Sequence, residues 1–209
     1  MVKHNHAAAP VKHKPLGRPR TYDVDEALDR AIDVFCERGY SGASISALAQ
    51  AMGLVTGSLY KAFKDKEALF MAALQRYNAR NGRVTDGIVA AETSGMEKLR
   101  ALLKLYVSAS HSVEGLKGCL VVTSAVELTT FSAQVADRVE GCIEELKGLL
   151  MRIVRLGQRD GSINTSIEPE AAAVFILCHL QGLRVMGKLN PSAHELGLAS
   201  DLVVTVLKP

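Results

Sequence analysis

The chain has 209 residues, which is enough for one or two domains with a sizeable buried core. Its 48% hydrophobic and 22% charged residues are typical of an ordinary globular protein. No apolar run reaches the roughly 18 residues of a membrane span, and the N-terminus lacks an apolar signal core. We therefore expect a cytoplasmic protein without a membrane partner, whose four widely spaced cysteines are free thiols.

The charge is distributed unevenly along the chain. The net charge is +3, but residues 1–22 carry five Lys or Arg and no acid, which leaves −2 for the remainder. Three prolines and a run of alanines in this segment predict a disordered basic arm. Arg18 and Arg20 flank a proline that favours an extended backbone, and such arms suit an A·T-rich minor groove. A solubilising tail, or a metal site at its histidines, is the alternative.

A first amphipathic helix is expected to begin after Asp23 and to end at Gly39. Its apolar face consists of Val24, Ala27, Leu28, Ala31, Ile32 and Phe35, which recur at helical spacing. Asp23 is the expected N-cap, and Glu26 stands three residues later, as in a capping box. This helix should supply the core of a small N-terminal domain.

Two short helices separated by a tight turn are expected between Ser44 and Phe63. The first has apolar residues at i, i+3, i+4 and i+7 after Ser44, whose hydroxyl can cap it. Gly53 should stop that helix, because glycine enters the left-handed backbone region without a Cβ penalty. The second begins near Thr56 and turns Leu59 and Phe63 inward. A small polar and basic outer face completes a helix-turn-helix layout, whose second helix enters the major groove of DNA.

The stretch from Ser41 to Phe70 resembles the DNA-binding domain of the TetR family of bacterial transcriptional regulators. The matching pattern is GLVTGSLYKAFKDKEALF at residues 53–70, preceded by ERGYSGASISALAQAMG. The family's frequent residues stand at Gly39, Tyr40, Ser44, Leu48, Ala49, Gly53, Leu59, Tyr60, Phe63, Lys66, Glu67 and Leu69. Val55 departs from the pattern, which often has a capping Ser or Thr there, and we expect Thr56 to cap the second helix instead.

The resemblance implies an all-α protein with three parts: an arm at residues 1–22, a three-helix DNA-binding domain at 23–66, and a helical regulatory and dimerisation domain at 67–209. It implies a sequence-specific regulator of transcription, commonly a repressor released by a small molecule, with no cofactor and no catalytic activity. Its partners would be a palindromic double-stranded operator, a second copy and an unidentified effector. The residues expected to contact DNA are Arg18, Arg20, Ser44, Thr56, Gly57, Ser58, Tyr60, Lys61, Lys64 and Lys66.

The rest of the chain is expected to be helical. The expected helices cover residues 66–90, 95–111, 119–128, 132–160, 171–189 and 192–207. Residues 171–180 are apolar on nearly every side, which predicts a helix buried all round. In the family, the last two helices pair with those of a second copy, and the expected interface residues are Val174, Leu177, Gly182, Leu183, Met186, Leu196, Ala199, Leu202, Val203 and Val206. The alternative is that this apolar surface is wholly internal to a monomer.

An apolar cavity in the second domain should take the effector. Candidate lining residues are Tyr77, Leu103, Tyr106, His111, Cys119, Glu127 and His179, each of which could equally be a packing or surface residue. The segment from Gly118 to Glu127 resembles one branch of the family, with the pattern G-C-[LF]-[LV]-x-x-[ST]-A-x-E. Cys119 is therefore the candidate for a thiol- or soft-metal-sensing alternative, in which Cys142, Cys178 and His179 would be the other ligands.

Two other function classes remain. The sequence has no P-loop, G-x-S-x-G, H-E-x-x-H or G-x-G-x-x-G pattern, which argues against the commonest enzyme classes. A helical scaffold without DNA activity would leave the basic arm and the polar face of the second short helix unexplained.

Overall fold

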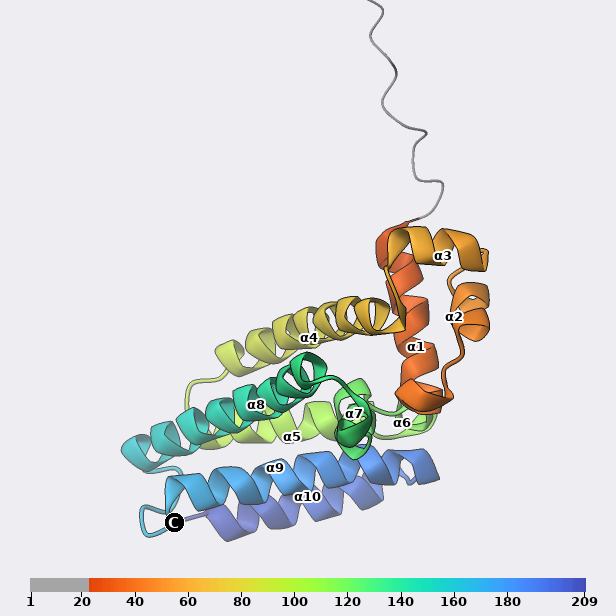
Figure 1. The fold of residues 1–209 in the computed structure, drawn as a ribbon. Helices are drawn as coiled ribbons and strands as arrows, with labels where there is room; N and C mark the ends of the chain where they lie inside the picture. Colours follow the sequence, from red (N-terminus) through yellow and green to blue (C-terminus); the bar gives the residue numbers. More distant parts are fainter. Residues whose placement is uncertain (1–22) are drawn as a thin grey trace, which may run out of the picture.

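A computed structural model describes residues 23–209, and helices are the only regular elements among them. The N-terminal group comprises α1 (Val24–Gly42), α2 (Ile45–Ala51) and α3 (Thr56–Ala62). The second group comprises α4 (Lys66–Ala91), α5 (Gly95–Ala109), α6 (Ser112–Lys117), α7 (Leu120–Val126), α8 (Ala133–Asp160), α9 (Pro169–Met186) and α10 (Ala193–Leu207), with short 3-10 segments η1 (Leu128–Thr130) and η2 (Gly187–Leu189). The expected all-α fold is confirmed (Figure 1).

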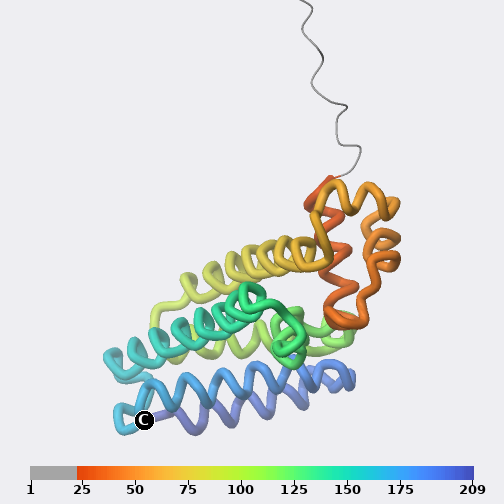
Figure 2. The backbone as a smooth tube through the Cα atoms, viewed as in Figure 1, coloured from red at the N-terminus to blue at the C-terminus, as the bar shows by residue number. Residues whose placement is uncertain are grey.

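The two groups of helices meet along α1. Helix α4 leads away from the small N-terminal group, and α9 and α10 run side by side along the opposite edge of the molecule (Figures 1 and 2). Helix α5 packs against α4, α8, α9 and α10, which places it at the centre of the second group. Helix α1 contacts α6 and α7 as well as α2 and α4, so the N-terminal group is attached at several points.

Buried apolar side chains form two clusters. The first fills the N-terminal group and continues into α4, α7 and the start of α8, with Phe35, Leu59 and Phe70 among its buried members. The second lies between α5, α8, α9 and α10. Because the first cluster extends past residue 66, helices α1 to α3 share one core with the helices that follow them.

Most local signals at the helix ends are confirmed. The side chains of Asp23 and Ser44 accept hydrogen bonds from backbone N–H groups in the first turns of α1 and α2. Asp65 caps α4 in the same way. Gly53 has a φ of 69° after α2, as expected of a left-handed stop. Gly39 also has a positive φ, of 70°, but α1 kinks there and continues beyond it.

Two capping expectations are wrong. Glu26 does not reach back to Asp23, because its carboxylate pairs with Arg30 at 2.6 Å. Thr56 is the first residue inside α3 and does not cap it. The cap position belongs to Val55, which has no side-chain hydrogen bond to offer, so the first turn of α3 has no side-chain cap.

Helix α6 lies between the expected helices at 95–111 and 119–128 and was not predicted from the sequence. Gly115 serves close packing inside α6. A Cβ added there would lie 2.6 Å from the carbonyl oxygen of Ser110 and 3.1 Å from that of Gly187, so only glycine lets α6 approach η2 this closely. Gly118 does end the helix, with a φ of 88°.

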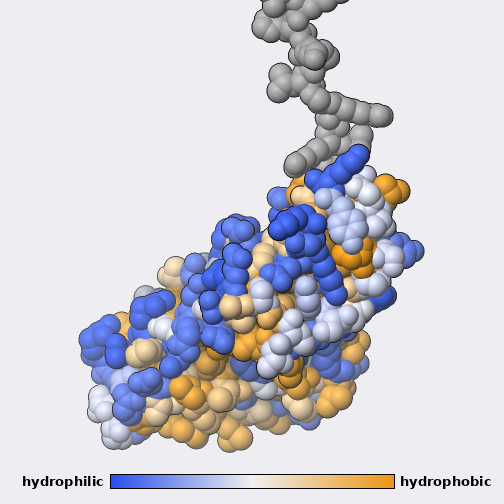
Figure 3. All heavy atoms as spheres, viewed as in Figure 1, coloured by the Kyte–Doolittle hydropathy of each residue, from blue (hydrophilic) through white to orange (hydrophobic). Residues whose placement is uncertain are grey.

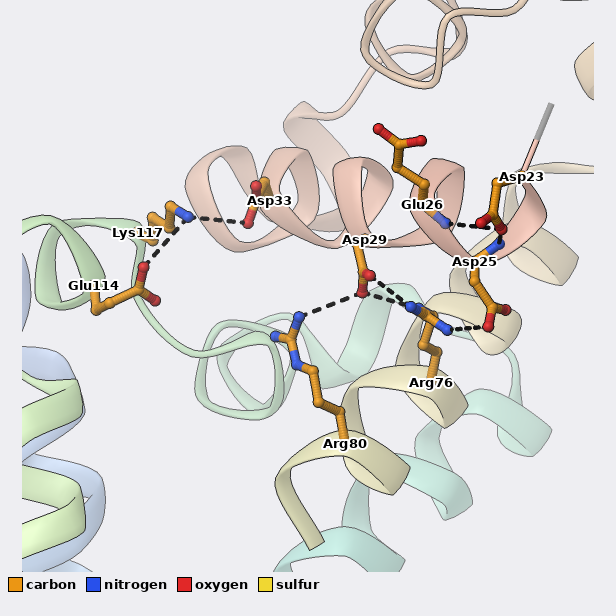
Figure 4. A network of polar contacts seen from close by, with 9 residues as sticks. All are labelled: Asp23, Asp25, Glu26, Asp29, Asp33, Arg76, Arg80, Glu114 and Lys117. Carbon is orange, nitrogen blue, oxygen red and sulfur yellow. Dashed lines mark hydrogen bonds and ion pairs between the residues drawn. The ribbon is translucent and has the colours of Figure 1, made fainter. Parts of the chain in front are cut away.

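Charged side chains tie α1 to α4 (Figure 4). Arg76 of α4 lies between two carboxylates of α1, with Nε 2.8 Å from Oδ1 of Asp29 and Nη1 2.8 Å from Oδ2 of Asp25. Arg80, one turn later, adds a 3.3 Å contact to Asp29. The hydrogen bond from Arg76 holds the pKa of Asp29 below its usual value. This network fixes the angle between the two helices.

Replacing Arg76 with Gln should lower the free energy of unfolding at neutral pH by about 1–2 kcal/mol, because the bidentate contact to Asp29 is lost. A lowered pKa means that the stabilisation is complete above the unfolded value of about 3.9 and is lost as pH falls through the folded value. Urea denaturation of wild type and variant should be compared at neutral pH and at an acidic pH near the folded pKa of Asp29. The difference in the free energy of unfolding between the two proteins should be smaller at the acidic pH.

The matched control is Arg30→Gln, which removes an exposed pair one turn apart on the same helix and should cost only about 0.3 kcal/mol. Equal losses in the two variants, or a difference that grows in acid, would contradict this assignment.

Candidate functional site

Helix α3 stands at one end of the molecule with most of its surface in solvent (Figure 1). Leu59 is its one buried residue and anchors the helix to the first core cluster. The exposed residues on and just after α3 include Thr56, Gly57, Tyr60, Lys61 and Lys64, and Ser58 is half-buried. The expected DNA-contacting residues of this helix therefore lie together on its outer side.

The outer side of α3 is small, polar and basic. A Cβ added at Gly57 would meet no atom within 4 Å, so internal packing does not require this glycine. A surface that a large partner approaches closely would favour a residue without a side chain there. Lys61 and Lys64 form no ion pair within residues 23–209, which leaves both charges available to a partner.

The other residues expected to contact DNA either have partners within the protein or lie outside the described residues. The ammonium of Lys66 lies 4.4 Å from the centre of the Tyr40 ring, and burial lowers the pKa of Lys66. Lys66 is therefore engaged at the junction between α1 and α4, and its contact with phosphate stays a prediction. Ser44 is exposed but uses its hydroxyl to cap α2. Arg18 and Arg20 lie outside the described residues.

Glu127 lies where the regulatory helices meet the end of α1. Its carboxylate accepts a hydrogen bond from the backbone N–H of Ser41 at 3.0 Å. It also sits beside Gly39, where an added Cβ would clash with it. Close by, the Tyr40 ring lies 4.7 Å from that of Phe131 and 5.3 Å from that of Phe70. Glu127, expected to bind a ligand, has its carboxylate on the backbone of α1 and does not line the larger cavity described next.

A cavity of about 450 Å³ lies between α1, α4, α5, α7, α8 and α9. Tyr77, Tyr106 and Cys119 line it, in agreement with the sequence-based expectation. Sequence reasoning missed Arg184 and several apolar or thiol residues of the lining, which are Ile32, Cys36, Leu105, Val121, Leu146 and Leu149. Cys142, which was expected only in the thiol- or metal-sensing alternative, lines the cavity too. The volume suits a small organic molecule.

The remaining expected ligand residues do not reach this cavity. Leu103 and His111 line a separate hollow of about 400 Å³ between α5 and α10. His179 forms a 3.0 Å hydrogen bond with the hydroxyl of Ser200, which joins α9 to α10, and burial lowers the pKa of His179. Side-chain chemistry suggested that Leu103, His111 and His179 share one ligand site with Tyr77. In the structure these three residues face α10 instead.

Three thiols border the cavity in different states. Burial raises the pKa of Cys36 to about 12, so its thiol stays protonated and unreactive. Cys119 accepts a hydrogen bond from the hydroxyl of Tyr77 at 3.3 Å, and Cys142 accepts one from the amide of Asn78 at 2.8 Å. Within residues 23–209 no group of three or more metal-ligating side chains is assembled, so the metal-sensing alternative has no preformed site there.

The outer side of α9 and α10 carries exposed apolar side chains, which gather along the lower edge in Figure 3. This face, the α9–α10 face, comprises Val174, Phe175, Val185, Met186, Leu198, Leu202 and Val206. Helix α9 is long and apolar enough to cross a membrane by length and composition, but its other side packs against α5, α8 and α10. The expectation that α9 is buried all round is therefore wrong for the single chain.

The expected interface residues divide between the two sides of these helices. Val174, Gly182, Met186, Ala199, Leu202 and Val206 are exposed. Leu177, Leu183, Leu196 and Val203 are buried within their own chain, and for these four the expectation is wrong. Periodicity identified the apolar positions but not which side of each helix faces the core.

Comparisons with known proteins agree with this geometry. Residues 27–73 match the family model described as bacterial regulatory proteins, tetR family, and residues 95–202 match the tetracyclin repressor-like C-terminal domain. The chain belongs to the TetR family. A solved structure of another TetR family regulator, a cysteine mutant of CifR complexed with 26-base-pair operator DNA, is 34% identical with a TM-score of 0.82. The match covers 91% of this chain and 100% of that one.

Two curated relatives are named as repressors. ComR of Escherichia coli K12 is 27% identical over 186 residues, which cover 88% of each chain. DhaR of Mycobacterium sp. GP1 is 26% identical over 190 residues, which cover 91% of this chain and 94% of DhaR. With the exposed face of α3, these likenesses identify this TetR family member as a DNA-binding regulator of transcription and not an enzyme.

Replacing Glu127 with Ala should loosen the end of α1, because the Ser41 amide loses its acceptor. Hydrogen exchange measured by NMR should show the Ser41 amide exchanging about tenfold faster or more, with stability lowered by about 1 kcal/mol. The control is Glu140→Ala, an exposed glutamate of α8, which should leave both quantities unchanged. Unchanged exchange at Ser41 in Glu127→Ala would show that this contact does not hold α1.

Proposed function

We propose that this regulator represses transcription as a homodimer bound to a palindromic operator, and that a small organic molecule in the 450 Å³ cavity releases it. The observation that carries the proposal is the shared core, in which one helix, α1, supports α3 and also lines the cavity. A ligand that favours one arrangement of α1 would shift the population between DNA-competent and incompetent dimers. The names of ComR and DhaR as repressors support this direction. The protein would act in the cytoplasm.

On the operator, α3 would lie in the major groove. Thr56 and Ser58 are proposed to reach base edges, with Gly57 allowing close approach. Tyr60, Lys61, Lys64 and the exposed hydroxyl of Ser44 would contact phosphates, which position the protein but do not specify sequence. Arg18 and Arg20 would enter the minor groove and steepen the dependence on salt.

The α9–α10 face is the proposed dimer interface. Exposed apolar side chains that form one contiguous face usually mark a contact surface, and the two helices would pair with the same helices of a second copy. A twofold dimer reads two half-sites about one helical turn apart, roughly 34–36 Å, or somewhat wider.

A thiol-sensing regulator is the second candidate. The specific observation that favours it is Cys119, a partly exposed cavity thiol in contact with the hydroxyl of Tyr77. The response of such a sensor would require the thiol of Cys119, whereas a regulator that binds its effector reversibly would respond without it. Replacing Cys119 with Ser therefore discriminates between the two proposed functions.

Selection from a random pool of double-stranded DNA, repeated at two salt concentrations, tests the proposal directly. An enriched palindrome is expected. Against that sequence, Tyr60→Ala should weaken binding to all variants alike, whereas Thr56→Ala should relax the preference at one position of each half-site, worth about 1–3 kcal/mol. Salt-sensitive binding without a motif would overturn the proposal of sequence-specific repression.

Replacing Leu202 with Glu should convert the dimer to monomers, because it puts a charge in the centre of an apolar contact. Light scattering after size exclusion would measure the mass, and operator affinity should fall by about 100-fold or more because only one half-site is held. Val126→Glu, at a still more exposed position on α7, is the control and should remain dimeric. A dimeric Leu202→Glu protein would rule out this face.

A further inference from the structure

Arg184 of α9 is a buried cation without an anionic partner. Its side chain is 8% exposed, and it lines the 450 Å³ cavity. Its guanidinium donates to the carbonyl of Gly118 at 2.6 Å and, more weakly, to the hydroxyl of Ser110 at 3.4 Å. Both partners are neutral, and no Asp or Glu of residues 23–209 forms an ion pair with it.

The other charges along the cavity wall are either paired or exposed. Lys117 lies between Asp33, at 3.6 Å, and Glu114, at 3.4 Å (Figure 4). The remaining paired groups are Arg80 with Asp29 and Glu145 with Arg138, and the exposed ones are Asp86 and Arg152. Arg184 is therefore the one buried charge that the described part of the cavity wall leaves uncompensated.

A buried arginine cannot escape this situation by losing its proton, because the guanidinium stays protonated in proteins. Burying a charge is strongly unfavourable unless an opposite charge or good hydrogen bonds compensate it. Two neutral acceptors satisfy only part of the five N–H groups of a guanidinium. The planar fork of N–H groups matches a carboxylate, which can accept two of them at once.

The neighbouring wall favours an organic anion over an inorganic one. Burial raises the pKa of the Tyr106 phenol, so Tyr106 lines the cavity as a neutral hydroxyl that does not repel an anion. Leu105, Leu146 and Leu149 form an apolar wall in the same cavity. A volume of about 450 Å³ exceeds what a bare phosphate or chloride would fill.

We propose that the cavity binds an organic carboxylate, with its carboxylate group paired with Arg184 and its apolar body against Leu105, Leu146 and Leu149. This assignment rests on the proposed effector role of the cavity and names the chemical class of the effector.

The same contacts offer a route from the ligand to α1. A carboxylate at Arg184 competes with the carbonyl of Gly118 for the guanidinium. One turn further on, Lys188 donates to the carbonyl of Lys117 at 2.7 Å and to that of Cys36 in α1 at 3.1 Å. Release of Gly118 therefore loosens the segment that, with Lys188, holds the end of α1.

Matched pairs of acids and amides test the proposal, because each pair differs in charge but hardly in shape. The probes are octanoate and octanamide, 3-phenylpropanoate and its amide, and indole-3-acetate and its amide, titrated calorimetrically into the full-length protein. At least one carboxylate should bind about tenfold or more tightly than its amide. The preference should vanish in Arg184→Gln and persist in Arg155→Gln, which makes the same change at an exposed arginine of α8 outside the cavity.

Circular dichroism and operator binding show whether Arg184→Gln is folded. If it is not, Arg184→Lys keeps a charge but loses the fork, and should retain only part of the preference. Equal affinity for acid and amide, a preference that survives in Arg184→Gln, or no binding by any probe up to about 1 mM would overturn the proposal.

Operator binding, measured separately with each probe, distinguishes this proposal from the one on which it rests. A carboxylate that binds through Arg184 but leaves the operator complex intact supports the anion site and overturns release by an effector. A neutral amide that releases the operator without any preference for the acid supports release and overturns the anion site.

Discussion

The aromatic junction at the end of α1 is the constraint on which the rest of the structure depends. Three helices of this size bury too little apolar surface to be stable alone. Their core is completed from outside, by Phe70 of α4 and by Phe131 before α8, which pack on Tyr40. Because α4 and the segment before α8 supply part of the core of this small domain, the domain cannot reorient without disturbing the helices that surround the cavity. Glu127 adds a second connection at the end of α1, because its carboxylate accepts a hydrogen bond from the backbone N–H of Ser41.

One face of α1 serves both the core and the cavity. Leu28, Ile32, Phe35 and Cys36 all belong to the core that supports α3, and Ile32 and Cys36 also border the cavity. A ligand that displaces Ile32 or Cys36 therefore acts on the core through one rigid helix rather than through a chain of separate contacts. The kink at Gly39 lies between the part of α1 that carries this face and the part that Glu127 holds.

Local chemistry in the sequence was sufficient for most of the fold and for the exposed outer side of α3. Caps at Asp23 and Ser44 and the stop at Gly53 are decided by residues within one turn, so they could be predicted. The orientation of Glu127 and Lys66 depends on which helices meet at the junction, and no spacing along the chain encodes it. The burial of Leu177 and Leu183 within their own chain could not be predicted for the same reason. An apolar helix predicts burial, but its sequence does not show which side packs against the core.

The contacts around α3 explain how a small movement could matter at the DNA. A single buried residue, Leu59, anchors α3 to the core, so its direction follows that of the helices beneath it. Arg76 locks α1 to α4 through two carboxylates, which makes the N-terminal helices and the start of α4 one body. That body meets α7 through part of the shared core, which includes Leu120, and it meets α7 and η2 through the polar contacts of Glu127 and Lys188. Of these contacts the polar ones can change most readily, because polar groups exchange partners at less cost than a packed core can be rearranged.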